Sequence, residues 1–265
     1  KLAVFAVRLD TFPKPEKEQI FYVGTNQPQH LTNLRKQILS NFKQLPDMGE
    51  YLHRSYFDGA DVYCKDAYLA IKYFGTGFIP TLFRIKRQVD QLVSQWPLPI
   101  FQDHFSDRAL QFAAQLFPDH LPARMREYRN QYEHHMIILA SDHSIKETKE
   151  LLQQSCTRTD DECSYFECSE PEGKAALLHR YVAGNAPARY QILNADESGE
   201  LLPLDVALPR NCETWHEILP QEILCQMAET FQMSHFLCMV FHWDFVVKKG
   251  VDAADLKAKI LSILD

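Results

Sequence analysis

Two histidines near the end of the chain are the first residues whose type and spacing could do chemistry. His235 and His242 bracket six apolar residues in the stretch SHFLCMVFHWDFVVKKG, which spans residues 234–250. Imidazole has an ordinary pKa of about 6.5, so it can act as a general base or bind a divalent metal. Side chains on a regular strand alternate between its faces, so an odd separation sends the two rings to opposite sides. The rings can share a ligand only where a bulge or turn interrupts the strand.

A second group of candidates places histidine beside another polar residue. The stretch YEHHMIIL puts His134 and His135 just ahead of an apolar run, and LLHRYVAG puts His179 and Arg180 late in a helical pattern. A guanidinium can hold a planar carboxylate through two hydrogen bonds, which makes Arg180 a candidate clamp for a carboxylate substrate. The alternative stays open, because the helix dipole also favours arginine near a helix C-terminus. Histidines at the edge of a strand are likewise more often solvated or capping than catalytic.

Several other classes of site are not supported by the sequence. The spacing of Cys156, Cys163 and Cys168 fits no closed tetrahedral zinc pattern. The stretch FGTG lacks the Lys-Ser/Thr ending of a phosphate-binding loop, and no G-x-S-x-G elbow occurs. We therefore expect neither a structural metal on these thiols nor a dinucleotide bound by this chain.

The composition is that of an ordinary globular protein, with 46% hydrophobic and 24% charged residues. A net charge of -7 argues against a general nucleic-acid binder, which is normally basic. Seven cysteines without CxxC pairs indicate reduced thiols in a cytosolic compartment. Apolar runs reach only about six residues, far below the roughly 18 needed to span a bilayer. The chain starts at Lys1 without Met and opens straight into a strand-like run, so we expect a piece of a longer protein.

The hydrophobic pattern predicts an uneven alternation of strands and helices. Leu31, Leu34, Ile38 and Phe42 recur at helical spacing, and Asp252 caps a last amphipathic helix. Further helices are expected at 59–73, 144–154, 171–183 and 220–231. Strands are expected at 2–9, 19–24, 50–57, 134–141, 163–169, 201–208 and 234–250. This pattern predicts an α+β fold in which helices cover one antiparallel sheet, interrupted by an insert.

The insert, residues 76–130, has a composition of its own. It contains five prolines, and its aromatic residues alternate with basic ones, so we expect irregular or helical structure there. Its seven Lys/Arg against five Asp/Glu give a net charge of +2, which leaves -9 on the remainder. A cationic, aromatic-rich segment suits an anionic membrane surface, where each basic residue near the headgroups is worth about 1 kcal/mol. A long surface loop with solvated charges is the alternative.

Seven phrases occur in an order that resembles one known family. They are KLAVFAVRLDTF, YVGTNQP, FPDHLPARM, YEHHM, LHRYVAG, LDVALPRN and FHWDFVVKKGVD. Together they resemble the respiratory, FAD-dependent D-lactate dehydrogenases of bacterial inner membranes, flavoproteins of the vanillyl-alcohol oxidase superfamily. The resemblance covers the chain from Lys1 to Asp265. It matches the substrate-side cap domain and the membrane-binding region inserted in it, whereas the FAD-binding domain of that family lies upstream.

The resemblance implies a division of the chain into three parts. Residues 1–75 and 131–265 would form the cap domain, and residues 76–130 the membrane-binding insert. D-lactate would lie between the cap and FAD, and electrons would pass on to a membrane quinone. The family implies a peripheral protein at the cytoplasmic face of the bacterial inner membrane, on an anionic phospholipid surface. The expected membrane contacts are Arg84, Lys86, Arg87, Trp96, Arg108, Arg124, Arg126 and Arg129.

The resemblance also assigns roles to the two histidines of the opening stretch. Related 2-hydroxyacid dehydrogenases bind a divalent metal with two histidines seven apart, which flank a Gly-Asp-Gly-Asn turn. His235 and His242 keep this spacing, but the FLCMVF between them contains no turn former. We therefore expect the two rings to diverge. His242 would face the flavin as general base, His235 would be the second catalytic candidate, and a metal on this pair is left as an open alternative.

The substrate-binding residues follow from the same resemblance. LLHR followed by LDVALP is similar to the family's Trp-x-x-Arg helix and the strand after it, which implies that Arg180 clamps the lactate carboxylate. His179, His134 and His135 complete the expected substrate-binding set. Gly184, one turn after Arg180, departs from the threonine of those relatives, so the size of the substrate is left open.

Two other functions compete with this interpretation. One is a non-catalytic membrane-surface or interaction module with the same α+β fold, and the other is the cap of a flavoenzyme that acts on another 2-hydroxy acid. Because the cofactor that carries the chemistry would be bound elsewhere, we expect the isolated chain to be inactive.

Overall fold

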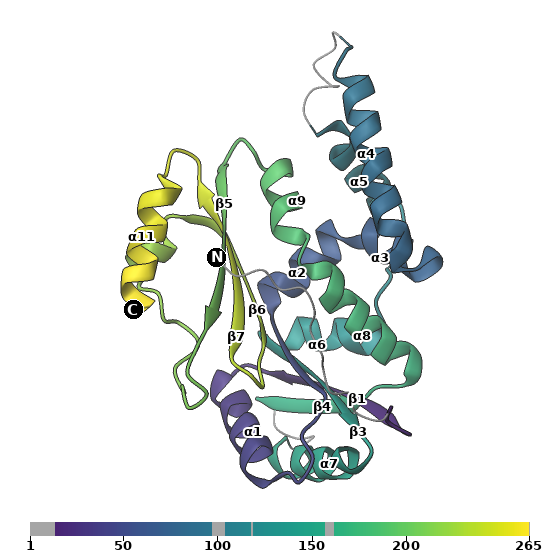
Figure 1. Ribbon diagram of the computed structural model, residues 1–265, viewed down its shortest axis with the longest axis vertical. Coiled ribbons are helices and arrows are strands. Elements are labelled where there is room, and N and C mark those ends of the chain that lie inside the picture. The colour runs from purple at the N-terminus through teal and green to yellow at the C-terminus, as the bar shows by residue number, and fades with distance from the viewer. Residues whose placement is uncertain (1–13, 97–103, 118, 157–161, 265) are drawn as a thin grey trace, which may run out of the picture.

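Seven strands form one antiparallel sheet that runs through the body of the protein (Figure 1). The computed structural model describes residues 14–96, 104–117, 119–156 and 162–264. Within them the strand order is β4-β1-β3-β2-β6-β7-β5. The strands are β1 (Glu18–Thr25), β2 (Met48–His53), β3 (His134–Ser141), β4 (Cys163–Glu167), β5 (Ser198–Ala207), β6 (Met227–His235) and β7 (Val240–Lys248).

Helices cover both faces of this sheet, and each face has its own hydrophobic core. One face carries α1 (Pro28–Asn41), α7 (His143–Ser155) and α11 (Ala253–Leu264). The other face carries α2 (Arg54–Tyr63), α3 (Lys65–Phe74), α6 (Ala123–Gln131), α8 (Glu170–Ala183) and α9 (Ala186–Leu193). A short helix, α10 (Gln221–Leu224), precedes β6. The predicted α+β fold, with helices covering one antiparallel sheet, is confirmed.

Side-chain periodicity explains the elements that were predicted correctly. In β3, Ile137 and Ile138 are neighbours in sequence and enter opposite cores, because strand side chains alternate. In α1, Leu34 and Ile38 lie one turn apart on the buried stripe. Pro28 stands in the first turn of α1, where its missing N–H costs no helical hydrogen bond.

The start of α8 is held at a defined position on the sheet. Ser169 and Glu172 form a capping box, in which the Ser169 amide donates to the Glu172 carboxylate at 2.8 Å. Arg124 of α6 donates to the same carboxylate at 2.8 Å and holds its pKa at about 2. Gly173 lies so near Ile20 of β1 that a Cβ atom there would come within 2.7 Å of the Ile20 side chain. These contacts fix where the later turns of α8 lie.

Some of the predicted elements differ from the structure in type or extent. Residues 54–57 begin α2 instead of extending β2, because the His53 side chain accepts from the Ser55 amide at 3.1 Å and caps a helix. Residues 227–231 belong to β6, and the helix expected there is limited to α10. Pairing with β7 along Met227–His235 outweighs the helix propensity of that segment. The strand expected at 2–9 lies outside the described residues.

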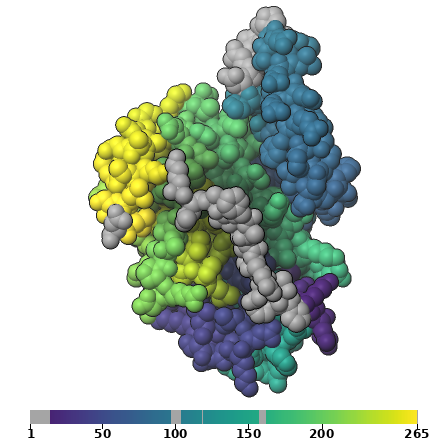
Figure 2. Space-filling model, in the orientation of Figure 1, coloured from purple at the N-terminus to yellow at the C-terminus, as the bar shows by residue number. Residues whose placement is uncertain are grey.

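The insert, for which irregular or helical structure was expected, is largely helical in its described residues. It contains a 3₁₀ turn at Thr76–Phe78, then α4 (Ile79–Val93), α5 (Phe105–Gln115) and α6. Two of its prolines mark helix starts, since Pro80 stands in the first turn of α4 and Pro122 is the N-cap of α6. We refer to the 3₁₀ turn, α4 and α5 as the arm. The arm stands out from the body (Figures 1 and 2).

The two helices of the arm are tied together at the end far from the body. Asp90 of α4 accepts from the backbone amide of Ser106 at 2.8 Å and from its hydroxyl at 2.7 Å. The carboxylate thus satisfies a free amide in the first turn of α5 and interacts favourably with the dipole of that helix.

Several histidines are buried beneath the helical layer. His135 of β3 and His179 of α8 both pack on Phe57, with ring centroids 5.2 and 4.4 Å from it. Burial lowers the pKa of each of these histidines to about 3, because the charged imidazolium cannot be solvated there. Both rings are therefore neutral at pH 7 and act as core residues.

This burial predicts an acid-sensitive core. The pKa of these histidines is lower in the folded state than in the unfolded chain, so stability is complete above about pH 6.5 and falls with decreasing pH towards 3, by about 1.4 kcal/mol per pH unit for each histidine. Replacing His179→Phe is expected to make the pH dependence of the free energy of unfolding shallower by that amount between pH 6 and 4. Denaturant unfolding at several pH values measures it, with the exposed His143→Gln as control. An unchanged slope in His179→Phe would contradict the assignment.

Candidate functional site

A tight turn brings His235 and His242 together. β6 ends at His235 and β7 begins at Val240, so the four residues between them form a hairpin turn. The ring centroids of the two histidines lie 5.1 Å apart, with the ring planes at 84°. The expectation that the rings diverge along one continuous strand is therefore wrong.

The turn is stabilised by burial instead of by turn-forming residues. Met239 has a φ of 58°, a left-handed conformation that costs roughly 1–2 kcal/mol for a residue with a side chain. Met239 and Phe236 are both fully buried, and each contributes about 1.5–3 kcal/mol through that burial. Phe236 packs on Trp215 with ring centroids 4.8 Å apart. The gain from two buried side chains outweighs the strain of one left-handed residue, so no glycine is needed.

A line of charged and polar side chains passes through both histidines. The Arg180 guanidinium lies 3.0 Å from one oxygen of Glu50, and the other oxygen lies 2.8 Å from Nδ1 of His235. Next to it, Nδ1 of His242 lies 2.6 Å from the Asp205 carboxylate. We call these five residues the polar chain.

Strand pairing assembles the polar chain from distant parts of the sequence. Glu50 of β2 is paired with His235 of β6, and Asp205 of β5 is paired with His242 of β7. Paired residues point to the same sheet face, so all four side chains lie on the face covered by α8. Arg180, in the last turn of α8, reaches this face from the helical layer.

The two ends of the polar chain differ in their access to water. The side chains of Glu50 and Arg180 are 6% and 12% exposed, whereas those of His235 and Asp205 are 48% and 79% exposed. The helical layer covers the first end only. A small molecule can therefore reach the histidines from the open side and meet the arginine at the inner end.

A second polar pair lies deeper on the same sheet face. Asp244 follows His242 by two residues on β7, and the Tyr56 hydroxyl of α2 donates to its carboxylate. Burial raises the pKa of Asp244, while the hydrogen bond from Tyr56 acts in the opposite direction. Burial also raises the pKa of Tyr56, so the phenol keeps its proton.

This arrangement suits proton transfer beside a group that binds carboxylates. A carboxylate at Nδ1 fixes the tautomer of a histidine and leaves Nε2 as the proton acceptor. Asp205 does this for His242, and Glu50 does it for His235. Within the described part of the chain, no three or more His, Cys, Asp or Glu side chains are placed to hold a metal ion.

The other predicted substrate-binding histidines lie elsewhere. His135 and His179 are enclosed in the core, as described above. His134 points to the opposite sheet face, where its Nδ1 lies 2.9 Å from the Tyr51 hydroxyl, and burial lowers its pKa to about 3. Of the expected substrate-binding set, only Arg180 joins the polar chain. Sequence reasoning missed Glu50, Asp244 and Tyr56, which no local motif distinguishes.

Exposed apolar side chains gather on the arm and on the end of α3 before it. Of the fourteen exposed large hydrophobic residues in the described part of the chain, nine belong to this region, far more than scattered exposure would place there. They are Tyr73, Phe74, Phe83, Ile85, Leu92, Trp96, Phe112, Leu116 and Phe117. Ile85 and Leu92 are separated by seven residues and so share one side of α4, and Trp96 lies just beyond the end of that helix. None of the described helices is long and apolar enough to cross a membrane.

The structure divides the predicted basic residues into two groups. Arg84, Arg87 and Arg108 are exposed on the arm and form no ion pair with any described residue. The other four form ion pairs with carboxylates, three of them at 2.5–2.6 Å. The pairs are Lys86 with Asp107, Arg124 with Glu172, Arg126 with Asp119, and Arg129 with Asp58. The second group is largely neutralised, so only the first offers free positive charge to a partner.

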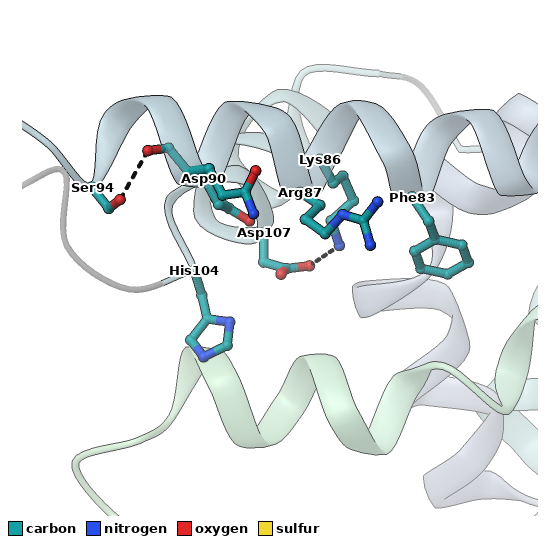
Figure 3. Close-up of a pocket in the computed structure, with 8 residues that line it drawn as sticks. Phe83, Lys86, Arg87, Asp90, Ser94, His104 and Asp107 are labelled. Atoms are coloured by element: carbon teal, nitrogen blue, oxygen red, sulfur yellow. Dashed lines mark hydrogen bonds and ion pairs between the residues drawn. The ribbon is translucent and has the colours of Figure 1, made fainter.

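A cleft of about 410 Å³ lies along the arm and is lined by residues of α4, α5 and the segments next to them (Figure 3). Figure 3 shows Phe83, Lys86, Arg87 and Asp107 directed towards it from the arm. Asp107 is already bound by Lys86 at 2.6 Å, and Asp90 is used to cap α5. Among the Lys, Arg and Asp side chains that line this cleft, the Arg87 guanidinium therefore has no ion-pair partner among the described residues, and it adds to the positive charge of the arm.

The comparisons with known proteins agree on one family. The family model described as "D-lactate dehydrogenase, membrane binding" matches residues 20–265. The chain is 44% identical to the quinone-dependent D-lactate dehydrogenase of Escherichia coli, 43% to that of Haemophilus influenzae and 36% to that of Corynebacterium glutamicum. Each alignment covers 100% of this chain and 46% of the relative, so the chain spans about half the length of the curated relatives it matches.

A solved structure gives a weaker likeness. A 4-ethylphenol oxidase from Gulosibacter chungangensis aligns with 96% of this chain and 43% of its own, at 10% identity and a TM-score of 0.43. A TM-score of that size does not establish a shared fold.

The burial of Arg180 with Glu50 leads to a test of the polar chain. Replacing Glu50→Gln leaves a buried guanidinium without its counter-charge, which is expected to lower the free energy of unfolding by about 3–5 kcal/mol. Glu170→Gln is the matched control, because its pair with Lys174 is exposed and such pairs contribute about 0–1 kcal/mol. Denaturant unfolding at pH 7 compares the two variants. Equal losses would mean that Arg180 does not depend on Glu50.

Proposed function

The chain belongs to the membrane-binding family of D-lactate dehydrogenases, and on that basis we propose what it does in the whole enzyme. It forms the membrane-binding and substrate-covering part of a peripheral, FAD-dependent enzyme that oxidises D-lactate to pyruvate and reduces a membrane quinone. The observation that carries this proposal is the arm, where exposed apolar side chains and unpaired arginines lie together.

The arm has the features of an interfacial membrane contact. Ile85, Leu92 and Trp96 can enter the boundary between headgroups and acyl chains, and tryptophan is favoured at that depth. Arg84, Arg87 and Arg108 can pair with anionic phospholipid headgroups. We assign residues 76–130 to the membrane-binding insert, with residues 1–75 and 131–265 as the cap domain. An anionic leaflet facing the cytoplasm is the surface that this charge pattern favours.

The polar chain supports a role for this domain in the oxidation of the substrate. His242 accepts the proton of the lactate hydroxyl at Nε2, and Asp205 stabilises the imidazolium that results. Arg180 binds the lactate carboxylate, and Glu50 holds the guanidinium in position from the other side. His235 holds Glu50 in position through its Nδ1, and its ring packs against that of His242 beside the substrate.

The cofactor would lie against the open end of the polar chain. Asp205 and His235 are exposed there, which leaves room for a flat group held by the rest of the enzyme. When bound, FAD supplies the hydride acceptor that no side chain of this domain provides. D-lactate releases two electrons and two protons on becoming pyruvate, and a quinone takes up the same number on becoming a quinol.

The residues described do not select the side chain of the substrate. Arg180 and His242 would bind the carboxylate and hydroxyl of any 2-hydroxy acid, so the dehydrogenase of another 2-hydroxy acid is the second candidate function. The ratio of kcat/KM for D-lactate to that for longer 2-hydroxy acids distinguishes the two.

Membrane binding is tested with variants of the arm. Replacing Arg84, Arg87 and Arg108 by Gln together is expected to weaken binding to anionic vesicles about 100-fold, because each basic residue contributes about 1 kcal/mol. Binding of the unmodified protein should also fall with increasing salt. Co-sedimentation with anionic and with neutral vesicles measures both effects.

Two further variants complete the membrane test. Leu92→Gln is expected to weaken binding to both kinds of vesicle, since it removes apolar contact. Leu261→Gln on α11 is the control, because it changes another exposed leucine far from the arm in sequence. If the arginine variant and Leu92→Gln bound as the control does, the arm would not be the membrane contact.

Catalysis is tested in the full-length enzyme. His242→Asn is expected to lower kcat for D-lactate by about 10²–10⁴, the usual contribution of a general base. Arg180→Lys should act mainly on KM, because lysine keeps the charge but loses the two-pronged geometry. His216→Asn is the control, since His216 lies outside the polar chain. A His242 variant with unchanged kcat would remove it from the mechanism.

A further inference from the structure

A second cavity lies between the arm and the helical layer of the body. It has a volume of about 590 Å³, within the range of small-molecule sites. Its walls come from α3, the 3₁₀ turn and α4 on one side and from the end of α8 and α9 on the other. Small residues on both sides leave the space open, among them Ala67, Ala70, Gly184 and Ala188.

Most of the cavity wall is apolar, but one part of it is a network of buried charges. Arg189 of α9 lies 3.0 Å from Asp66 of α3 and 2.9 Å from Asp107 of α5. Lys86 of α4 donates to Asp107 at 2.6 Å. These four side chains are only 9–16% exposed.

The charge network has hydrogen-bonding capacity that the described residues do not use. Nη1 of Arg189 is buried and has no hydrogen-bond partner. The Lys86 ammonium carries three donors, and Asp107 is its hydrogen-bond partner in the structure. A buried ion-pair network contributes little to the stability of the fold, and a buried donor without a partner costs free energy. A ligand that accepts a hydrogen bond here would remove that cost, which favours its binding.

The charges of this network select a neutral ligand. Two cations, Arg189 and Lys86, are balanced by two carboxylates, Asp66 and Asp107. A phosphate or fatty-acid carboxylate placed here would add an uncompensated negative charge beside them. A neutral oxygen acceptor on an apolar ring meets no such penalty.

The position of the cavity indicates where such a ligand comes from. Phe78, Ile79 and Phe83 line it, and they belong to the same arm whose outer side carries the exposed apolar stripe. A ligand dissolved in the lipid phase can therefore enter along the arm without crossing the aqueous surface.

The same helix also connects this cavity to the polar chain. Arg180 and Tyr181 are consecutive residues of α8, and Arg180 contacts Glu50 while Tyr181 lines the cavity. One turn of α8 therefore contributes one residue to the polar chain and the next residue to the wall of this cavity.

We propose that this cavity binds the head group of the membrane quinone, with Lys86 donating a hydrogen bond to a quinone carbonyl and the apolar wall of α3, α4 and α9 enclosing the ring. The proposal rests on the function proposed above and gives the binding site of the electron acceptor in it. The prenyl tail leaves along the arm towards the lipid.

The test uses the full-length enzyme with D-lactate and two acceptors, a short-chain soluble quinone and a water-soluble dye. Ala70→Phe and Ala188→Phe fill the cavity from opposite sides without changing any charge. Both are expected to raise KM for the quinone about tenfold or more, with dye reduction and vesicle binding unchanged. Lys86→Met should raise it by about tenfold, since it loses a charge-assisted hydrogen bond. Lys257→Met on α11 is the control, because it makes the same substitution at an exposed residue outside this cavity and outside the arm.

A photoactivatable azido-quinone supplies a readout that does not depend on turnover. Labelling of peptides from α3, α4 and α9, reduced by Ala70→Phe and by excess unlabelled quinone, is the expected result. Unchanged quinone KM in both filled variants, or labelling displaced by phospholipid but not by quinone, would overturn the proposal. Failure of the unmodified enzyme to reduce even the dye with D-lactate would instead overturn the proposed function, so the two failures are distinguishable.

Discussion

Burial of Phe236 and Met239 beneath Trp215 is the interaction on which the candidate site depends. Trp215 is itself held in the core, where its indole N–H donates to the Thr32 hydroxyl of α1 at 2.8 Å. The turn that these residues anchor reverses the chain between β6 and β7. Without it, His235 and His242 would lie on opposite faces of one strand, and the polar chain could not pass through both.

The two buried charge networks position groups more than they stabilise the fold. Arg180 with Glu50 fixes a guanidinium at the inner end of the polar chain, and Arg189 joins three helices through Asp66 and Asp107. Replacing such groups by apolar residues is often neutral or stabilising, so stability alone does not explain them. Both networks lie on the face covered by α8 and α9, which places a polar site on each side of these helices.

The arm and the body carry opposite electrostatic character. The whole chain has a net charge of -7, yet Arg84, Arg87 and Arg108 are unpaired on the arm. Near an anionic surface the body is repelled and the arm attracted, within a Debye length of about 8 Å at physiological salt. In the membrane contact proposed above, this asymmetry would orient the molecule before apolar contact is made, and the exposed side chains of α4 would then provide that contact.

The sequence by itself determined the elements with strong periodicity and the resemblance that identified the family. α1, β3, α7 and α8 follow from apolar spacing because a local pattern decides which face is buried. The tertiary structure decided what no local pattern contains. It turned the chain at Phe236–Met239 through burial, converted 227–231 from helix to strand by pairing with β7, and placed Glu50 and Asp205 beside histidines 185 and 37 residues away. Strand register sets these partnerships, and register depends on the packing of the whole sheet.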